Sequence, residues 1–148
     1  MTPNQAEIEP IHILLVEDSS LDTQIIRHNF QRARFLNEVH HVTDGAKALD
    51  ILFHRAPCSD QKEYPTPQLV LLDLHLPRID GWEVLETLRN HSDLKDLPVL
   101  VMTSTEEDQQ AVEQYERGPT LWISKPIDLS QMLTKLIPLR LFSVALTL

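Results

Sequence analysis

The sequence is poor in cysteine and in basic residues, and each shortage excludes a class of protein. Cys58 is the only cysteine among 148 residues, so no internal disulfide can form and a reducing compartment is the natural setting. Lys and Arg number 13 against 22 Asp and Glu. The resulting formal charge of -9 argues against a nucleic-acid partner, because phosphate binding needs a basic face. We expect protein partners instead.

Long apolar runs are also lacking, and none approaches the ~20 residues that a membrane-spanning helix requires. Residues 1–10 are polar and acidic, without the basic and then apolar pattern of a secretory signal. The apolar end of the chain is short and carries Pro138 and Arg140. We therefore expect a cytoplasmic protein with no membrane partner. It should have a disordered N-terminal arm at 1–10, one folded domain at 11–137 and an apolar C-terminal extension at 138–148.

Five apolar segments alternate with five helical patterns along the folded domain. Strands are expected at 12–17, 38–42, 68–73, 98–102 and 121–124, and helices begin near residues 19, 44, 81, 106 and 128. This alternation predicts an α/β fold, in which helices cover both faces of a parallel sheet.

Three segments carry secondary expectations. The helix that follows Asp44 is expected to bury Ala46, Leu49, Leu52, Phe53 and Ala56. Residues 57–67 contain three prolines and read as a solvated loop, in which Cys58 is an incidental thiol. The helix at 106–117 has few apolar anchors and should be the least firmly packed.

Acidic residues follow two of the predicted core strands. The apolar run 69–72 ends in Asp73, and the run 12–16 leads into Glu17 and Asp18. Ligands of such sheets bind beyond the carboxyl ends of the strands. Three carboxylates gathered there would raise one another's pKa, so a hard divalent cation is expected, with Mg²⁺ best suited to oxygen ligands and retained waters.

Thr103 and Lys125 follow two further strands and should lie at the same edge. Asp73 could then attack phosphorus and become an aspartyl-phosphate. The Lys125 ammonium would neutralise phosphoryl oxygens, and the Thr103 hydroxyl would donate one hydrogen bond. Each residue alone is weak evidence, but their joint occurrence in order is hard to produce by accident.

These motifs resemble the receiver domain of two-component response regulators. The resemblance covers about residues 11–137 and implies a flavodoxin-like (βα)5 three-layer sandwich with sheet order 2-1-3-4-5. It rests on four segments: Leu15-Val16-Glu17-Asp18, Leu71-Leu72-Asp73 followed by Leu76-Pro77-Arg78-Ile79-Asp80-Gly81, Met102-Thr103-Ser104, and Lys125-Pro126.

The same resemblance implies residue roles. Asp73 would accept a phosphoryl group from a histidine kinase. Asp18 and Asp73 would bind Mg²⁺ directly, Glu17 through water, and the main-chain carbonyl of His75 would complete the protein ligands. The Lys125–Pro126 peptide would be cis. The protein would phosphorylate itself and lose the group slowly, and would not be an enzyme with external turnover.

The family also implies a switch and an interface. It couples the Thr103 position to an aromatic residue three places before the lysine, here Trp122. The ring is expected to turn inward and to change the face formed by residues 106–117, 121–124 and 129–137. We expect a homodimer through this face and the C-terminal extension. Too few residues follow Pro126 for an output domain, so a receiver standing alone is expected.

A narrower likeness concerns the kinase. The apolar extension, the long loop before the strand at 68–73, and the segment at 38–45 are similar to stand-alone receivers that work with bacterial, often cyanobacterial, phytochrome histidine kinases. Two departures from the family pattern stand out: Glu17 replaces the commoner Asp, and Pro119 replaces a small residue.

Three other functions compete with this reading. A degenerate receiver would bind partners without phosphorylation, but the set of Asp18, Asp73, Thr103 and Lys125 is intact. A phosphohydrolase with an aspartyl-phosphate would place an acid where His75 stands. A flavin-binding protein shares the fold, but Glu17 and Asp18 would repel the flavin phosphate. The neighbouring His40 and His41 show no metal-ligand spacing and are expected to be surface or strand-edge residues.

Overall fold

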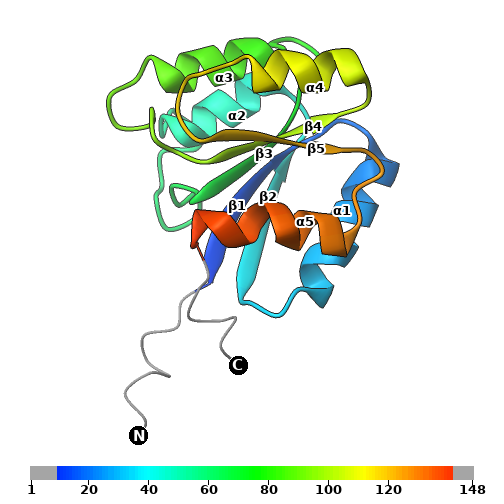
Figure 1. Cartoon of the computed structure of the whole chain (residues 1–148). Helices are drawn as coiled ribbons and strands as arrows, with labels where there is room; N and C mark the ends of the chain where they lie inside the picture. Colours follow the sequence, from blue (N-terminus) through cyan, green and yellow to red (C-terminus); the bar gives the residue numbers. More distant parts are fainter. Residues whose placement is uncertain (1–9, 142–148) are drawn as a thin grey trace, which may run out of the picture.

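Five parallel strands form the centre of the computed structural model, which describes residues 10–141 (Figure 1). They are β1 (Ile11–Val16), β2 (Asn37–Val42), β3 (Leu69–Asp73), β4 (Val99–Thr103) and β5 (Thr120–Ser124). The strands lie in the order β2-β1-β3-β4-β5, and every neighbouring pair is parallel. The predicted α/β class and strand order are confirmed.

Helices cover both faces of this sheet, as the alternating pattern predicts. They are α1 (Ser20–Arg32), α2 (Gly45–Leu52), α3 (Gly81–Arg89), α4 (Glu106–Glu113) and α5 (Leu129–Leu136), and a short 3-10 helix, η1 (Ile137–Leu139), follows α5. Figure 1 shows α2, α3 and α4 on one side of the sheet and α1 with α5 on the other. The result is a three-layer sandwich.

Each α-helix begins with a polar N-cap. In every case the cap side chain accepts a hydrogen bond from the backbone N–H three residues later, which typically stabilises a helix by ~1 kcal/mol. Because each helix follows a strand, these caps fix the helix N-termini near the carboxyl edge of the sheet. The caps are Ser19, Asp44, Asp80, Thr105 and Asp128.

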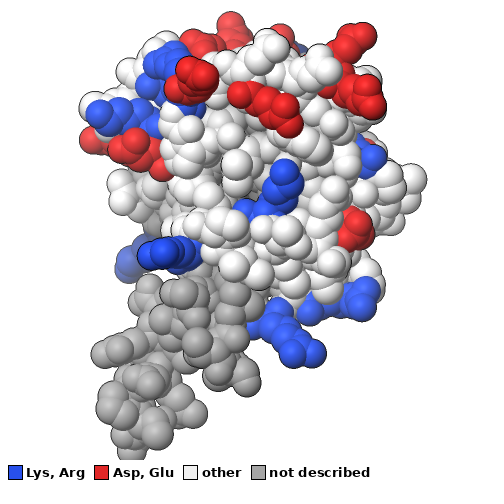
Figure 2. Space-filling view, viewed as in Figure 1, with Lys and Arg blue, Asp and Glu red and all other residues white. Residues whose placement is uncertain are grey.

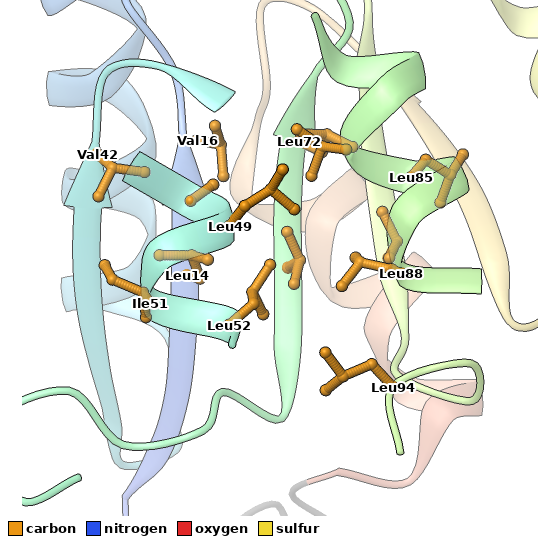
Figure 3. Packing of buried hydrophobic residues seen from close by; sticks show 14 of the residues in the cluster. Leu14, Val16, Val42, Leu49, Ile51, Leu52, Leu72, Leu85, Leu88 and Leu94 are labelled. Carbon is orange, nitrogen blue, oxygen red and sulfur yellow. The ribbon is translucent and has the colours of Figure 1, made fainter. Parts of the chain in front are cut away.

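Alternate side chains of the strands enter two separate cores. Leu14 and Val16 of β1 join a cluster with α2 and α3, which Figure 3 shows around Leu49, Leu72 and Leu85. Residues between them in β1 join the cluster under α1 and α5. A strand buried on both faces explains why these segments are apolar at nearly every position. In β1, β3, β4 and β5 the only acid is Asp73, at the carboxyl end of β3, whereas the edge strand β2 carries Glu38 near its start.

The predicted inner face of α2 is partly wrong. Leu49 and Leu52 are buried, but Ala48 and Ile51 take the places assigned to Ala46 and Ala56. The helix ends at Leu52, so Ala56 lies beyond it and is exposed. The prediction extended the helical period past this end.

The segment at 57–67 is less solvated than predicted. The Cys58 side chain is fully buried and belongs to the core cluster with α2 and α3, and Tyr64 packs against the same cluster. Because this segment is polar and rich in proline, its composition did not indicate these two core contacts. By contrast, α4 buries only Val112, in agreement with the expectation of weak packing.

The chain end is described in part. Helix α5 ends at Leu136, Pro138 lies in η1, and Leu139 and Leu141 pack against the core beneath the sheet. Residues 1–9 of the predicted arm and 142–148 of the predicted extension lie outside the described residues. Within the described part, no helix has the length and apolar character needed to cross a bilayer.

Candidate functional site

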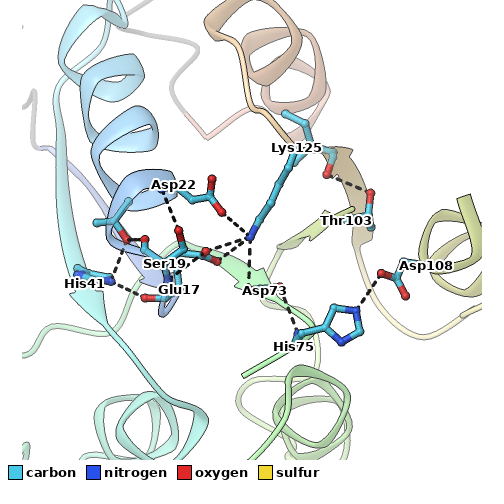
Figure 4. Close-up of polar contacts among 11 residues, drawn as sticks. Glu17, Ser19, Asp22, His41, Asp73, His75, Thr103, Asp108 and Lys125 are labelled. Carbon is cyan, nitrogen blue, oxygen red and sulfur yellow. Dashed lines mark hydrogen bonds and ion pairs between the residues drawn. The ribbon is translucent and has the colours of Figure 1, made fainter. Parts of the chain in front are cut away.

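Three predicted acids meet at the carboxyl edge of the sheet, and Figure 4 shows two of them, Glu17 and Asp73. Glu17 directly follows β1, where its backbone N–H donates to Val42 O at 3.0 Å, and its side chain is fully buried. Asp73 ends β3 and is 5% exposed, while Asp18 is exposed. One carboxylate oxygen from each lies within 4.8 Å of the others. Residues distant in sequence thus form one acidic cluster.

Lys125 extends from the end of β5 into this cluster. Its Nζ lies 2.9 and 3.1 Å from the two Glu17 oxygens, 3.1 Å from Asp22 Oδ2 and 3.4 Å from Asp73 Oδ2. The Lys125 backbone N–H donates to Thr103 O at 2.8 Å, and the Lys125–Pro126 peptide is cis, as the resemblance implies. The ammonium therefore pairs with Glu17 more closely than with Asp73.

Asp22 belongs to the cluster although the sequence analysis did not assign it there. It lies in the first turn of α1, where its backbone N–H donates to Ser19 Oγ at 3.2 Å. A capped first turn directly after a strand places its third residue beside the strand end. The pattern of Ser19 followed three residues later by Asp22 was the signal available in the sequence.

The cluster carries more negative than positive charge. Burial, together with the neighbouring Asp73, raises the pKa of Glu17 to about 8. Burial alone would lower the pKa of Lys125, but hydrogen bonds to Glu17 and the charge of Asp73 raise it above its ordinary value. Burial opposes ionisation of Asp22, yet the contact with Lys125 lowers its pKa. One ammonium among four carboxylates leaves a surplus of oxygen ligands, which fits a hard divalent cation.

The side chains of Thr103 and Trp122 form their hydrogen bonds outside the cluster of Glu17, Asp18 and Asp73. The Thr103 side chain is fully buried, and its Oγ1 donates to Ile123 O at 3.3 Å. The half-buried Trp122 donates from Nε1 to Glu113 Oε1 at 2.9 Å, and the ammonium of Lys135 lies 4.3 Å from the centre of its ring. Helices α4 and α5 therefore both hold the indole.

Two histidines border the site. The His75 backbone N–H donates to Asp73 Oδ1 at 3.2 Å, and its ring Nε2 lies 3.1 Å from Asp108 Oδ2. His41 Nε2 lies 2.7 Å from Glu17 O, to which it can only donate. His41 thus ties the end of β2 to the residue that carries the buried carboxylate, a contact that the sequence analysis missed.

Comparisons with known proteins agree with this geometry. The family model for the response regulator receiver domain matches residues 13–137. Response regulator Rcp1 of Synechocystis sp. is 33% identical over 126 residues, which span 83% of this chain and 82% of Rcp1. The structure of the bacteriophytochrome response regulator RtBRR is 35% identical, with a TM-score of 0.82 over 90% of this chain and 80% of that one.

A second similar structure carries a metal. The Mn²⁺-bound form of Rcp1 is 30% identical to this chain and superimposes with a TM-score of 0.69, covering 88% of this chain and 92% of Rcp1. The family match spans most of the sequence, and both the fold and the acidic edge agree with it. The chain therefore belongs to the response regulator receiver domain family.

Proposed function

We propose that this chain accepts a phosphoryl group on Asp73 from a sensor histidine kinase and signals through a changed protein surface. Receiver domains are phosphoacceptors and not enzymes in the usual sense, and family membership implies a histidine kinase as partner. The observation that carries the proposal is the convergence of Glu17, Asp18 and Asp73, of which Glu17 and Asp73 pair with the Lys125 ammonium. This set is complete, which argues against a degenerate receiver.

The proposed chemistry is a single displacement at phosphorus. An Asp73 carboxylate oxygen forms the new bond, the bond from phosphorus to the donor nitrogen breaks, and its electron pair stays with the leaving imidazole. Lys125 already lies 3.4 Å from Asp73 Oδ2 and would balance charge on the phosphoryl oxygens. Thr103 would turn its hydroxyl from Ile123 O toward the new group.

Glu17, Asp18, Asp73 and the main-chain carbonyl of His75 would hold Mg²⁺ beside the acceptor. The bound ion would supply charge neutralisation for the phosphoryl oxygens. The fit rests on an all-oxygen donor set and on the surplus of carboxylates at this edge. The Mn²⁺ bound to the related Rcp1 supports a divalent ion of the same hard class.

Intact mass spectrometry tests the phosphoacceptor proposal. Incubation with acetyl phosphate and Mg²⁺ should add one phosphoryl mass to the wild-type protein. The adduct should disappear with a chelator and in Asp73→Asn, while Asp93→Asn, a matched change of an exposed acid, should keep it. A wild-type protein that binds Mg²⁺ but gains no mass would contradict the proposal.

The kinase is proposed to be a phytochrome, and the setting cytoplasmic. Support comes from the likeness to Rcp1 and to a bacteriophytochrome response regulator. Phosphotransfer profiling provides the test: a phosphorylated phytochrome kinase should transfer to this chain at least tenfold faster than an unrelated histidine kinase does. Equal transfer rates from the two kinases would argue against a phytochrome as the partner, but would not contradict phosphorylation of Asp73.

The output surface is proposed to be the face formed by α4, β5 and α5. Figure 2 shows acidic side chains along the top of this view, where α3 and α4 lie, with basic ones among them at the upper left and further basic ones lower on the molecule. Glu106 and Glu107 lie in the first turn of α4, and Lys135 lies in the last turn of α5. Opposite charges on two helices of one face suit a two-fold contact with a second copy, so a homodimer through this face is part of the proposal.

A further inference from the structure

A second group of metal-ligating side chains lies between the first two strands. His12 of β1 and Glu38 and His40 of β2 each offer one ligand atom, and these atoms all lie within 4.8 Å of one another. The group is separate from the acidic cluster, which forms at the opposite end of β1. Glu17, directly after this strand, comes five positions after His12, a span of ~16 Å at the usual rise.

Strand register explains why these residues meet. His12 is paired with Glu38 across the parallel ladder, and His40 is paired with Leu14. Side chains two residues apart in a strand share a face, so Glu38 and His40 lie on the side to which His12 also points. His41 points to the other face and contacts Glu17 O. The adjacent histidines His40 and His41 therefore face opposite sides of the sheet, and only His40 lies beside His12.

His12 has an unsatisfied nitrogen in this group. Its Nδ1 is inaccessible to solvent and has no hydrogen-bond partner, although Glu38 Oε2 lies 3.4 Å away. Nδ1 and the Glu38 carboxylate therefore face each other at a distance at which one cation could bind both, with the Nδ1 lone pair and a carboxylate oxygen as ligand atoms.

We infer that His12, Glu38 and His40 form a site for a divalent transition ion of the Zn²⁺ class. Two imidazoles and one carboxylate, with a position left for water, are a ligand set that Zn²⁺ takes in proteins. Zinc bonds of ~2.0–2.2 Å would require the three side chains to close by small rotations. His12 and His40 are half-buried and Glu38 is exposed, so the ion can enter from solvent.

The two ends of β1 thus carry sites of different chemical preference. Oxygen ligands at the carboxyl end suit Mg²⁺, and imidazoles at the other end suit Zn²⁺. An ion at the second site would cross-link β2, the edge strand, to β1. It would stabilise the edge of the sheet that carries His41 and the helix cap Asp44.

Calorimetric titration of the untagged protein with Zn²⁺, in excess Mg²⁺ to occupy the acidic site, tests the inference. We expect one ion per chain and a higher melting temperature with Zn²⁺ than without it. Glu38→Gln and His40→Gln should each weaken binding at least tenfold. His28→Gln, a change of an exposed histidine on α1, should not alter it.

Three results would overturn the inference. The first is that the wild type does not bind Zn²⁺. The second is that both Glu38→Gln and His40→Gln bind Zn²⁺ as tightly as the wild type. The third is that Mg²⁺ abolishes Zn²⁺ binding. The last would place the ion in the acidic cluster. Because Glu38 is exposed, Glu38→Gln tests the site without disturbing the core, even if a histidine variant folds poorly. Phosphorylation of Asp73 in these variants would show that the acidic site is unaffected.

Discussion

Glu17 combines full burial with a position beside Asp73, and both raise its pKa. Its pKa of about 8 lies well above the ordinary value of 4.5. Between these values the folded protein holds a proton that the unfolded chain has released. The contribution of Glu17 to the stability of the metal-free fold is therefore fully present below the ordinary pKa of 4.5. It is lost as the pH rises through the folded-state pKa of about 8.

Metal-free protein should accordingly unfold more easily as the pH rises across this window. Glu17→Gln, which mimics the protonated form, should show a weaker pH dependence of the free energy of unfolding. Urea denaturation at several pH values in the presence of a chelator measures both. Mg²⁺ should restore stability more at the alkaline end, because it favours the ionised carboxylate. Parallel pH profiles for the two proteins would contradict this role of Glu17.

Single residues also show which parts of the site the sequence could predict and which it could not. The motif residues Glu17, Asp18, Asp73 and Lys125 could be predicted to meet, because they all follow core strands of a parallel sheet. Asp22 could not be assigned so readily, because it reaches the site from a helix turn. The contact between His12 and Glu38 depends on strand register, which the apolar pattern alone does not fix.

At the scale of elements, Arg89 connects the end of α3 to two loops. Its buried guanidinium donates five hydrogen bonds, to the main-chain oxygens of Lys95, Leu97, Arg117 and Pro119 and to Thr120 Oγ1. A Cβ added at Gly118, where φ is 66°, would lie 2.5 Å from Arg89 Nε. These contacts fix the chain that leads from α4 into β5.

Arg89→Met should lower the free energy of unfolding by about 2–4 kcal/mol, because it leaves buried carbonyl groups without donors. Arg89→Lys should recover only part of this loss, since a lysine lacks the planar fork. Arg27→Met, on the exposed side of α1, should stay within ~0.5 kcal/mol of the wild type. Urea denaturation measures all three, and equal stabilities for the two methionine variants would refute the role of Arg89.

Helices α4 and α5 meet at Trp122, and the proposed switch should be visible there. In Trp82→Phe, Trp122 is the sole tryptophan, and its emission should change when Mg²⁺ and beryllium fluoride mimic the phosphoryl group. The reason is that an inward ring would lose its contacts with Glu113 and Lys135. Asp73→Asn should show no change. Constant emission in a protein that demonstrably binds beryllium fluoride would rule out the movement of Trp122.

At the scale of the whole molecule, the alternation of apolar strands and amphipathic helices was sufficient to predict the layers, while the family was indicated by the motif residues at the strand ends. What it could not predict was the end of α2 and the burial of Cys58. Both depend on how a proline-rich loop folds back on the core, and its local composition is that of a solvated segment. Long-range packing determines whether such positions are buried, whereas the apolar period and the N-cap residues determine where the helices form.

The proposed homodimer is also a property of the whole molecule. Ile137 is 52% exposed next to α5, so Ile137→Glu should weaken self-association at least tenfold. Leu36→Glu is a matched control, because Leu36 is equally exposed but lies between α1 and β2. Sedimentation equilibrium of the full chain measures the dissociation constants. A wild type that stays monomeric both with and without the phosphoryl group would contradict the dimer.

Localisation of the phosphoryl group tests the central claim most directly. Wild-type protein treated with acetyl phosphate and Mg²⁺ would be reduced with borohydride, which converts a phosphorylated aspartate to homoserine, and then mapped by peptide mass spectrometry. The account predicts that the change falls on Asp73 alone. A modification at another residue, such as Asp18 or His75, or an adduct that resists reduction, would contradict the account.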